Sequence, residues 1–214
     1  MKSLAAGLLR HDDGLVRCWW CGTDPLYVQY HDSEWGTPVT DEHRLFEKLS
    51  LEGFQAGLSW ITILRKREAF REAFAGFDPA KVAAFGSRDV TRLLGNAQIV
   101  RHRGKIEAVV SNARCYAELR AEGRSLADFL WSFAPAAPTP RAASARRTTR
   151  AEVPNITAES TALSRALKQR GWKFVGPTTM YAMFQAMGLV NDHLTGCFRH
   201  SQVEALLRPA RRSR

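Results

Sequence analysis

Residues 93–116 read LLGNAQIVRHRGKIEAVVSNARCY and predict two helices joined by a short turn. A short helix through Leu94 is expected to end at Gly95, and a second helix follows from about Lys105 to Leu119. The turn between them ends in a glycine among basic side chains. Amide groups at such a helix start can approach a phosphate closely, and the helix dipole favours the anion. The stretch is therefore either a phosphate-binding element or an ordinary helical hairpin with a solvated basic turn.

The hairpin spans about residues 87–119 and resembles the helix-hairpin-helix element that grips one DNA strand through its phosphates. Its candidate contacts to the DNA backbone are Arg101, Arg103, Gly104 and Lys105.

Helical patterns cover most of the remaining chain, because apolar residues recur at helical spacing behind capping residues. The residues expected before these helices are Thr40, Ser59, Asp78, Ser87 and Ser125. Two more helical patterns run over about residues 160–169 and 177–187. No alternating run is long enough to demand a sheet. The sequence therefore predicts an all-helical protein with two lobes joined near residues 134–155.

The positive charge is concentrated in two segments. The chain has 214 residues, is 45% hydrophobic and carries a formal net charge of +10. Eight arginines and no acid lie in residues 134–150 and 205–214. Such segments either keep a protein soluble or add a salt-sensitive attraction to phosphates, so net charge alone does not establish nucleic-acid binding.

The sequence favours a cytoplasmic protein that has no membrane association. Only four cysteines occur, too few for a disulfide scaffold in a chain of this length. No apolar run is long enough to span a bilayer. Residues 1–16 have too short an apolar stretch for a signal peptide and are expected to be a flexible extension. Residues 201–214 are expected to be a basic tail.

A group of cysteines and histidines raises the question of a metal. His193 and Cys197 are four residues apart, and Cys18 or Cys21 with His31 could supply two more ligands. Two cysteines and two histidines form a familiar structural zinc set, and metal can stabilise so long a loop closure. The alternative is that these are packing residues. A redox role for Cys-x-x-Cys is less favoured, since no βαβ setting is visible.

Five features occur together in order and with matching spacing. They are DPLYVQYHDSEWG (24–36), LEGFQAGLSWITILRKRE (51–68), IVRHRGKIEAVVSNAR (99–114), ALKQRGWKFVGPTTMYAMFQAMGLVNDH (166–193) and the late Cys197. Together they resemble the DNA-3-methyladenine glycosylase I family, constitutive bacterial enzymes of the helix-hairpin-helix glycosylase superfamily. The resemblance runs from about Arg17 to Cys197, which implies a glycosylase domain over residues 17–200.

The resemblance also implies one structural zinc ion that joins residues 18–31 to residues 193–197. Its ligands fall on Cys18, His31, His193 and Cys197. Cys18 is chosen because it stands six residues before Asp24, as the family's ligand does, whereas Cys21 has no counterpart. Four protein ligands leave no open coordination position, so a zinc hydrolase is not expected.

The same resemblance places base recognition at Glu52. The aromatic residues that it implies around this carboxylate are Trp20, Tyr27, Tyr30 and Trp60. A flipped base is read by stacking and by hydrogen bonds to its edge. Because N3-methylation makes adenine in a nucleotide cationic, aromatic faces and a carboxylate attract it more strongly than normal adenine.

Cleavage of the bond between base and deoxyribose then needs little assistance from the protein, because the charged base is already a good leaving group. The resemblance implies a monofunctional enzyme that acts on alkylated double-stranded DNA, leaves an abasic site and does not cut the strand. No dedicated catalytic acid or base is assigned beyond electrostatic assistance from Glu52. The chain is expected to act as a monomer. The rival hypothesis is an inactive, zinc-stapled DNA-binding module.

Overall fold

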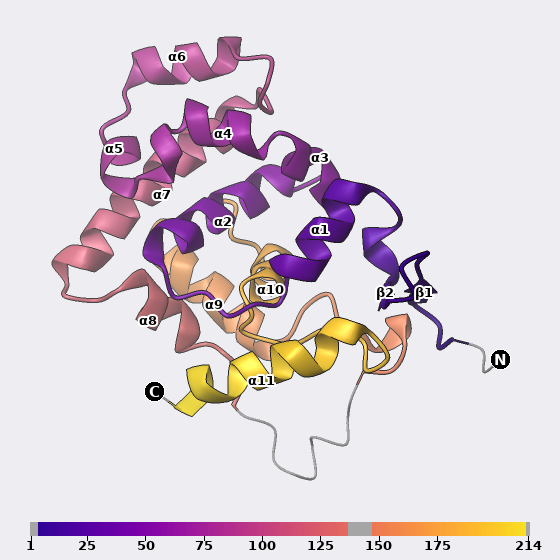
Figure 1. Ribbon diagram of the computed structural model, residues 1–214. Coiled ribbons are helices and arrows are strands. Elements are labelled where there is room, and N and C mark those ends of the chain that lie inside the picture. Colours follow the sequence, from indigo (N-terminus) through magenta and orange to yellow (C-terminus); the bar gives the residue numbers. More distant parts are fainter. Residues whose placement is uncertain (1–3, 137–146, 213–214) are drawn as a thin grey trace. The chain divides into compact units, whose positions relative to one another are not determined.

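The structure is a computed structural model that describes residues 4–136 and 147–212, with side chains placed as far as Leu207. Over these residues it has eleven α-helices and two short strands (Figure 1). The chain divides into two compact units. The terminal unit comprises residues 1–39, 134–155 and 184–214, and the central unit comprises residues 40–133 and 156–183.

The terminal unit contains both strands and two complete helices. These elements are β1 (Leu8–Arg10), β2 (Val16–Cys18), α1 (Pro25–Ser33) and α11 (Phe198–Arg212). The strands pair antiparallel, with Leu8 opposite Cys18 and Arg10 opposite Val16. This pairing brings the N-terminal extension directly to the first cysteine.

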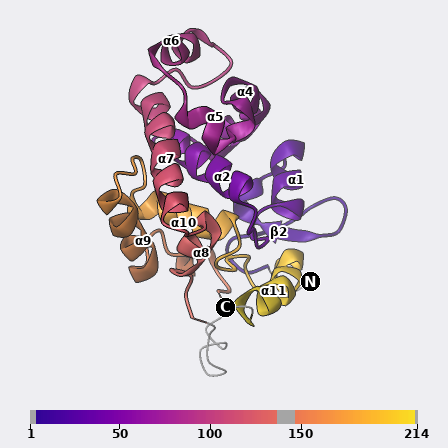
Figure 2. The same cartoon turned by 90° about the vertical axis from the view of Figure 1, so that its left-hand side faces the viewer.

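The central unit is wholly helical over the residues described. Its helices are α2 (Glu42–Gln55), α3 (Trp60–Arg65), α4 (Arg67–Ala73), α5 (Pro79–Ala83), α6 (Ser87–Gly95), α7 (Arg103–Ala121), α8 (Leu126–Trp131) and α9 (Ala158–Gln169). The helix α10 (Pro177–Ala186) begins in this unit, and its last residues, from Phe184, belong to the terminal unit. The long helix α7 packs against α2, α5, α6 and α8 (Figure 2).

Closely packed phenylalanine rings fill the core beside α2 and α4. The ring centroids of Phe54 and Phe70 are 4.5 Å apart, and those of Phe74 and Phe77 are 5.4 Å apart. All four side chains are fully buried. Aromatic side chains of this size dominate the energetics of a core, so this cluster holds the C-terminal half of α2 in place.

Several predicted helix starts are confirmed by their caps. The Asp78 carboxylate accepts hydrogen bonds from the amides of Ala80 and Lys81, and the Ser125 hydroxyl accepts one from the amide of Asp128. The cap of α2 is Asp41, one residue after the expected Thr40. The helix expected after Ser59 is present as α3, and a second helix, α4, follows it because the backbone leaves helical geometry at Lys66.

The N-terminal extension is a correction to the sequence-based expectation. Its described part, residues 4–16, contributes β1 and the start of β2 to a hairpin, and the Leu8 side chain packs with Cys18, Leu194 and Cys197. A Cβ atom at Gly196 would stand 2.5 Å from a Leu8 methyl carbon, so a larger residue there would force the Leu8 side chain to move. The all-helical prediction is therefore correct except for this hairpin.

The two basic segments are also partly ordered. Residues 201–212 of the expected tail belong to α11. Residues 137–146 of the expected linker lie outside the described residues, but the segment that follows is bonded into the terminal unit. There the Arg150 amide donates to the Ala6 carbonyl at 2.9 Å, and the Thr195 amide donates to the Arg147 carbonyl at 2.9 Å. Over residues 4–136 and 147–212, no helix combines the length and apolarity that a bilayer crossing requires.

The hairpin's packing can be tested by a matched pair of leucine variants. Leu8 is 9% exposed, whereas its neighbour Leu9 points to the other face and is 40% exposed. We expect Leu8→Ala to lower the free energy of unfolding by about 2–3 kcal/mol, because it leaves a cavity against the cysteine-bearing core. Leu9→Ala should change it by less than about 0.5 kcal/mol. Denaturant unfolding of both variants measures this, and equal effects would show that the hairpin does not pack as described.

Candidate functional site

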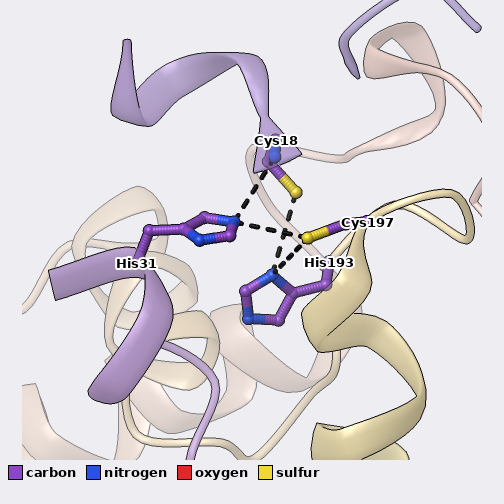
Figure 3. A group of neighbouring side chains, drawn as sticks. All are labelled: Cys18, His31, His193 and Cys197. Carbon is purple, nitrogen blue, oxygen red and sulfur yellow. Dashed lines mark hydrogen bonds between the residues drawn. The ribbon is translucent and has the colours of Figure 1, made fainter. Parts of the chain in front are cut away.

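Four buried side chains from distant parts of the sequence converge in the terminal unit (Figure 3). They are Cys18, His31, His193 and Cys197, and each is at most 4% exposed. One ligand atom from each lies within 4.8 Å of the other three. The structure thus brings together all four residues that the sequence analysis selected as metal ligands.

Local structure positions each of the four. Cys18 is the last residue of β2, and its sulfur accepts a hydrogen bond from the amide of Leu194. His31 lies on α1, which begins at the Asp24 cap with a proline at its first position. His193 and Cys197 flank a tight turn closed by a bond from the Cys197 amide to the Leu194 carbonyl at 2.7 Å.

The distances in the cluster suit a tetrahedral metal. Cys197 Sγ is 3.4 Å from His31 Nε2 and 3.5 Å from His193 Nδ1, and Cys18 Sγ is 3.8 Å from the same His193 nitrogen. Tetrahedral bonds of about 2.3 Å to sulfur and about 2.0 Å to nitrogen imply sulfur–nitrogen separations of about 3.5 Å. The donor set and its spacing therefore match zinc.

Outer hydrogen bonds fix the orientation of both imidazoles. His31 Nδ1 is 2.8 Å from an Asp32 carboxylate oxygen, and His193 Nε2 is 3.0 Å from the Trp35 carbonyl. Each bond leaves the other ring nitrogen aimed at the sulfurs, as in known carboxylate–histidine–metal arrangements. Arg17 holds Asp32 in turn through bonds of 2.7–3.1 Å. Burial raises the pKa of Asp32, but hydrogen bonds from Arg17 and His31 outweigh this and leave the pKa below its ordinary value.

The pKa values distinguish Cys197 from Cys18 and from the neighbouring Cys21, because the hydrogen bond between Cys18 and Cys197 raises the pKa of Cys18. A hydrogen bond with Cys18 lowers the pKa of Cys197, and bonds with His193 and His31 lower it further, which favours a thiolate. Burial lowers the pKa of His193 and keeps its imidazole neutral. Cys21 is buried too, but its thiol donates to the Cys18 carbonyl at 3.1 Å, and burial raises its pKa to about 12. Among the described residues, Cys21 is not part of the cluster of four side chains that could hold a metal.

An aromatic cluster lies directly beside these ligands. The Trp20 ring centroid is 5.1 Å from that of Tyr27, 6.2 Å from that of Tyr30 and 5.2 Å from that of His31. Trp20 and Tyr27 are half-buried, whereas Tyr30 is only 4% exposed. The structure thus brings together the three aromatic residues of the terminal unit that were assigned to base recognition.

The other two predicted base-recognition residues, Glu52 and Trp60, lie in the central unit with a lysine between them. Glu52 on α2 is 4% exposed, and one oxygen of its carboxylate is 2.8 Å from the Lys48 ammonium one turn earlier. The same ammonium is 3.1 Å from the centre of a Trp60 ring at the start of α3. Sequence reasoning missed Lys48, although its spacing of four residues from Glu52 was a signal that could have revealed it.

The predicted DNA-binding hairpin is present as α6, a turn and α7. His102 caps α7 by accepting a hydrogen bond from the Lys105 amide at 3.2 Å. Arg101 and Arg103 are exposed, and Arg103 forms an ion pair of 3.2 Å with Glu107 on the same helix. Gly104 is the second residue of α7, where a missing side chain leaves the helix start accessible.

Lys105 differs from these neighbours, because its side chain is 7% exposed. Its ammonium donates to the carbonyls of Phe54 and Ala56, at 2.9 and 2.5 Å, at the C-terminal end of α2. These carbonyls have no partner within a helix, and a cation at that end also suits the helix dipole. Burial lowers the pKa of Lys105. The Lys105 ammonium thus bonds α7 to α2, and its contact with a DNA phosphate stays a prediction.

Comparisons with known proteins agree on one family. The sequence profile described as methyladenine glycosylase matches residues 20–200. DNA-3-methyladenine glycosylase 1 of Escherichia coli strain K12 is 54% identical over 183 residues, which cover 86% of this chain and 96% of that protein.

Solved structures agree with this match. A crystal structure of a 3-methyladenine DNA glycosylase I has a TM-score of 0.81 and 52% identity, and the match covers 86% of this chain and 99% of that one. A second such enzyme, a tyrosine-to-phenylalanine variant in complex with 3-methyladenine, has a TM-score of 0.78 and 39% identity over 86% and 97% of the two chains.

The structural role of Lys105 can be tested against its neighbour Arg103. We expect Lys105→Met to lower the free energy of unfolding by about 1–3 kcal/mol, because the carbonyls of the buried Phe54 and of Ala56 lose this donor. Arg103→Met, at an exposed position, should change it by less than about 0.5 kcal/mol. Denaturant unfolding gives both values. An unchanged stability of Lys105→Met would contradict the bond to α2.

Proposed function

The chain belongs to the methyladenine glycosylase family, and on that premise we propose that it removes 3-methyladenine from alkylated DNA in base-excision repair. It hydrolyses the N-glycosidic bond between the damaged base and deoxyribose and leaves an abasic site. The observation that carries this function is the high identity to a curated enzyme of that activity over nearly its whole length.

We propose that Glu52 recognises the flipped base, together with Trp60 and with Trp20, Tyr27 and Tyr30. Two local features support these roles. Glu52 is a buried carboxylate on an otherwise apolar stretch of α2, and Trp20 joins the two tyrosines in one aromatic cluster. An aromatic face attracts a cationic base more than a neutral one, and a carboxylate accepts from its exocyclic amine. Normal adenine is neutral, so the aromatic face and the carboxylate add little to its binding.

The proposed reaction relies on the charge of the substrate. The base carries a positive charge at the methylated purine, so the departing base takes the electron pair of the glycosidic bond and becomes neutral. The sugar becomes oxocarbenium-like, and water then adds to it. Residues of the chain need only bind the base, orient it and hold a negative charge nearby. No lysine nucleophile is assigned, which fits a monofunctional enzyme.

We propose that Cys18, His31, His193 and Cys197 hold one structural zinc ion. The support is the two-sulfur, two-nitrogen donor set, its separations and the outer hydrogen bonds on both imidazoles. When bound, the ion supplies a cross-link and no reactive position, because the protein fills all four sites. The four ligands join the segment before α2 to the segment after α10, and they therefore close a loop that contains most of the chain.

The hairpin α6–α7 is proposed to bind the DNA backbone. Its support is the exposure of Arg101 and Arg103 and the glycine at the start of α7. We propose further that the chain acts as a monomer on double-stranded DNA in the bacterial cytoplasm.

The activity is tested by incubating the protein with methylated duplex DNA and analysing the bases set free. We expect free 3-methyladenine and a strand that stays intact until the abasic site is cleaved by alkali. Absence of any free base would overturn the proposed function and favour an inactive DNA-binding module.

The role of Glu52 is tested by Glu52→Ala, with Glu68→Ala as the control. We expect Glu52→Ala to lower the rate of base release by a factor of at least about 100, since one preorganised charged group is worth this much. The Glu68 side chain is 74% exposed and should be dispensable. Single-turnover rates at matched folded fraction measure both. A Glu52→Ala rate close to that of the wild type would refute the assignment.

The metal site is tested by Cys197→Ser, with the equally buried Cys21→Ser as its control. Elemental analysis should find one zinc per chain in the wild type and in Cys21→Ser, and much less in Cys197→Ser. Because metal binding contributes folding free energy, Cys197→Ser should also melt at a lower temperature. A metal-free wild type, or equal zinc in both variants, would contradict the proposed ligand set.

A further inference from the structure

We propose that Lys48 is a resident cation of the base pocket, which occupies the base-binding groups until a base displaces it. This inference rests on the proposed function, because it takes Glu52 and Trp60 to be groups that receive the base. It adds a residue to which neither the sequence analysis nor the comparisons assign a role.

The placement of the Lys48 ammonium carries the inference. It lies 2.8 Å from a Glu52 oxygen and 3.1 Å from the centre of a Trp60 ring. The side chains of all three residues are less than a tenth exposed. Lys48 thus places one positive charge on both a carboxylate and an aromatic face. These are the two features that a cationic methylated base requires.

A buried ammonium and carboxylate of this kind stabilise each other strongly, since each would otherwise be an uncompensated charge. The aromatic face adds a cation–π contribution. A base that stacks on the same face of Trp60 and bonds to the same carboxylate must therefore displace the ammonium. The flexible four-carbon stem of lysine allows the head group to move without a change of the helix.

This exchange has opposite consequences before and after the reaction. A cationic base replaces one positive charge with another, so the Glu52 carboxylate stays compensated. Once the glycosidic bond has broken, the base is neutral and no longer compensates the carboxylate. Return of the ammonium then favours release of the product. We therefore infer that Lys48 weakens binding of free 3-methyladenine and speeds its departure.

The test measures binding of free 3-methyladenine by quenching of tryptophan fluorescence in the wild type, Lys48→Met and Lys48→Arg. Met keeps the length of the side chain without the charge, so the affinity for free 3-methyladenine should rise about tenfold. This factor corresponds to a modest contribution from the buried ion pair and the cation–π contact. Arg keeps the charge, and its affinity should stay within about threefold of the wild type. Inhibition of turnover by added 3-methyladenine should increase in Lys48→Met alone.

A double-mutant cycle with Glu52→Gln separates this role from simple packing. Without the carboxylate the ammonium loses its anchor, so Lys48→Met should give little further gain in a Glu52→Gln background. If Lys48→Met fails to fold, Lys48→Gln serves for the same comparison. Binding that is unchanged or weaker in the uncharged variant would overturn the inference, because a purely structural lysine would weaken binding on removal. A wild type that neither binds nor releases 3-methyladenine would instead refute the proposed function.

Discussion

The terminal unit depends on the meeting of two cysteines and two histidines at one buried point. His31 and Cys197 are 166 residues apart in the sequence, and their side chains lie 3.4 Å apart. Closing so long a loop costs chain entropy, and burying thiols and imidazoles against one another costs desolvation. A tetrahedral metal offsets both costs, since it pairs every donor atom at once. The bonds to Asp32 and the Trp35 carbonyl complete the arrangement by fixing each ring.

The aromatic residues assigned to base recognition depend on the same anchor. The Trp20 ring lies against His31, and the Trp35 ring lies edge-on against His193 at 4.7 Å. One residue separates Trp20 from Cys18 in the sequence. A metal that holds Cys18 and His31 therefore also holds the short segment that carries Trp20, Tyr27 and Tyr30. In this account the ion orders the residues that read the base and takes no part in bond cleavage.

The sequence predicted features whose physical cause is local. The Asp78–Pro79 start of α5 and the hairpin α6–α7 follow from capping and helical spacing, and both are confirmed. Spacing alone left Cys18 and Cys21 as equal candidates for the metal. The family register separated them, and the geometry agrees because the Cys21 thiol points to a carbonyl.

Features that depend on tertiary packing were not predicted from the sequence. Strands β1 and β2 have three residues each, too few for an alternating pattern to stand out. The basic cluster before α7 gave no sign that Lys105 turns inward while its neighbours stay exposed. Lys48 was missed because a lysine one turn before a glutamate usually forms a solvated surface ion pair with it. The partners that the fold provides determine which charged side chain is buried. The Lys105 ammonium has two carbonyls, and the Lys48 ammonium has a carboxylate and an indole ring.

Base binding in the presence and absence of zinc tests whether the metal holds the segment that carries Trp20, Tyr27 and Tyr30. The affinity for free 3-methyladenine is measured on the zinc-loaded protein, after removal of the metal by a chelator, and after zinc is restored. We expect base binding to be lost when the metal is removed and to return when zinc is restored. A stripped protein that stays folded and binds the base as tightly as the loaded one would contradict the claim.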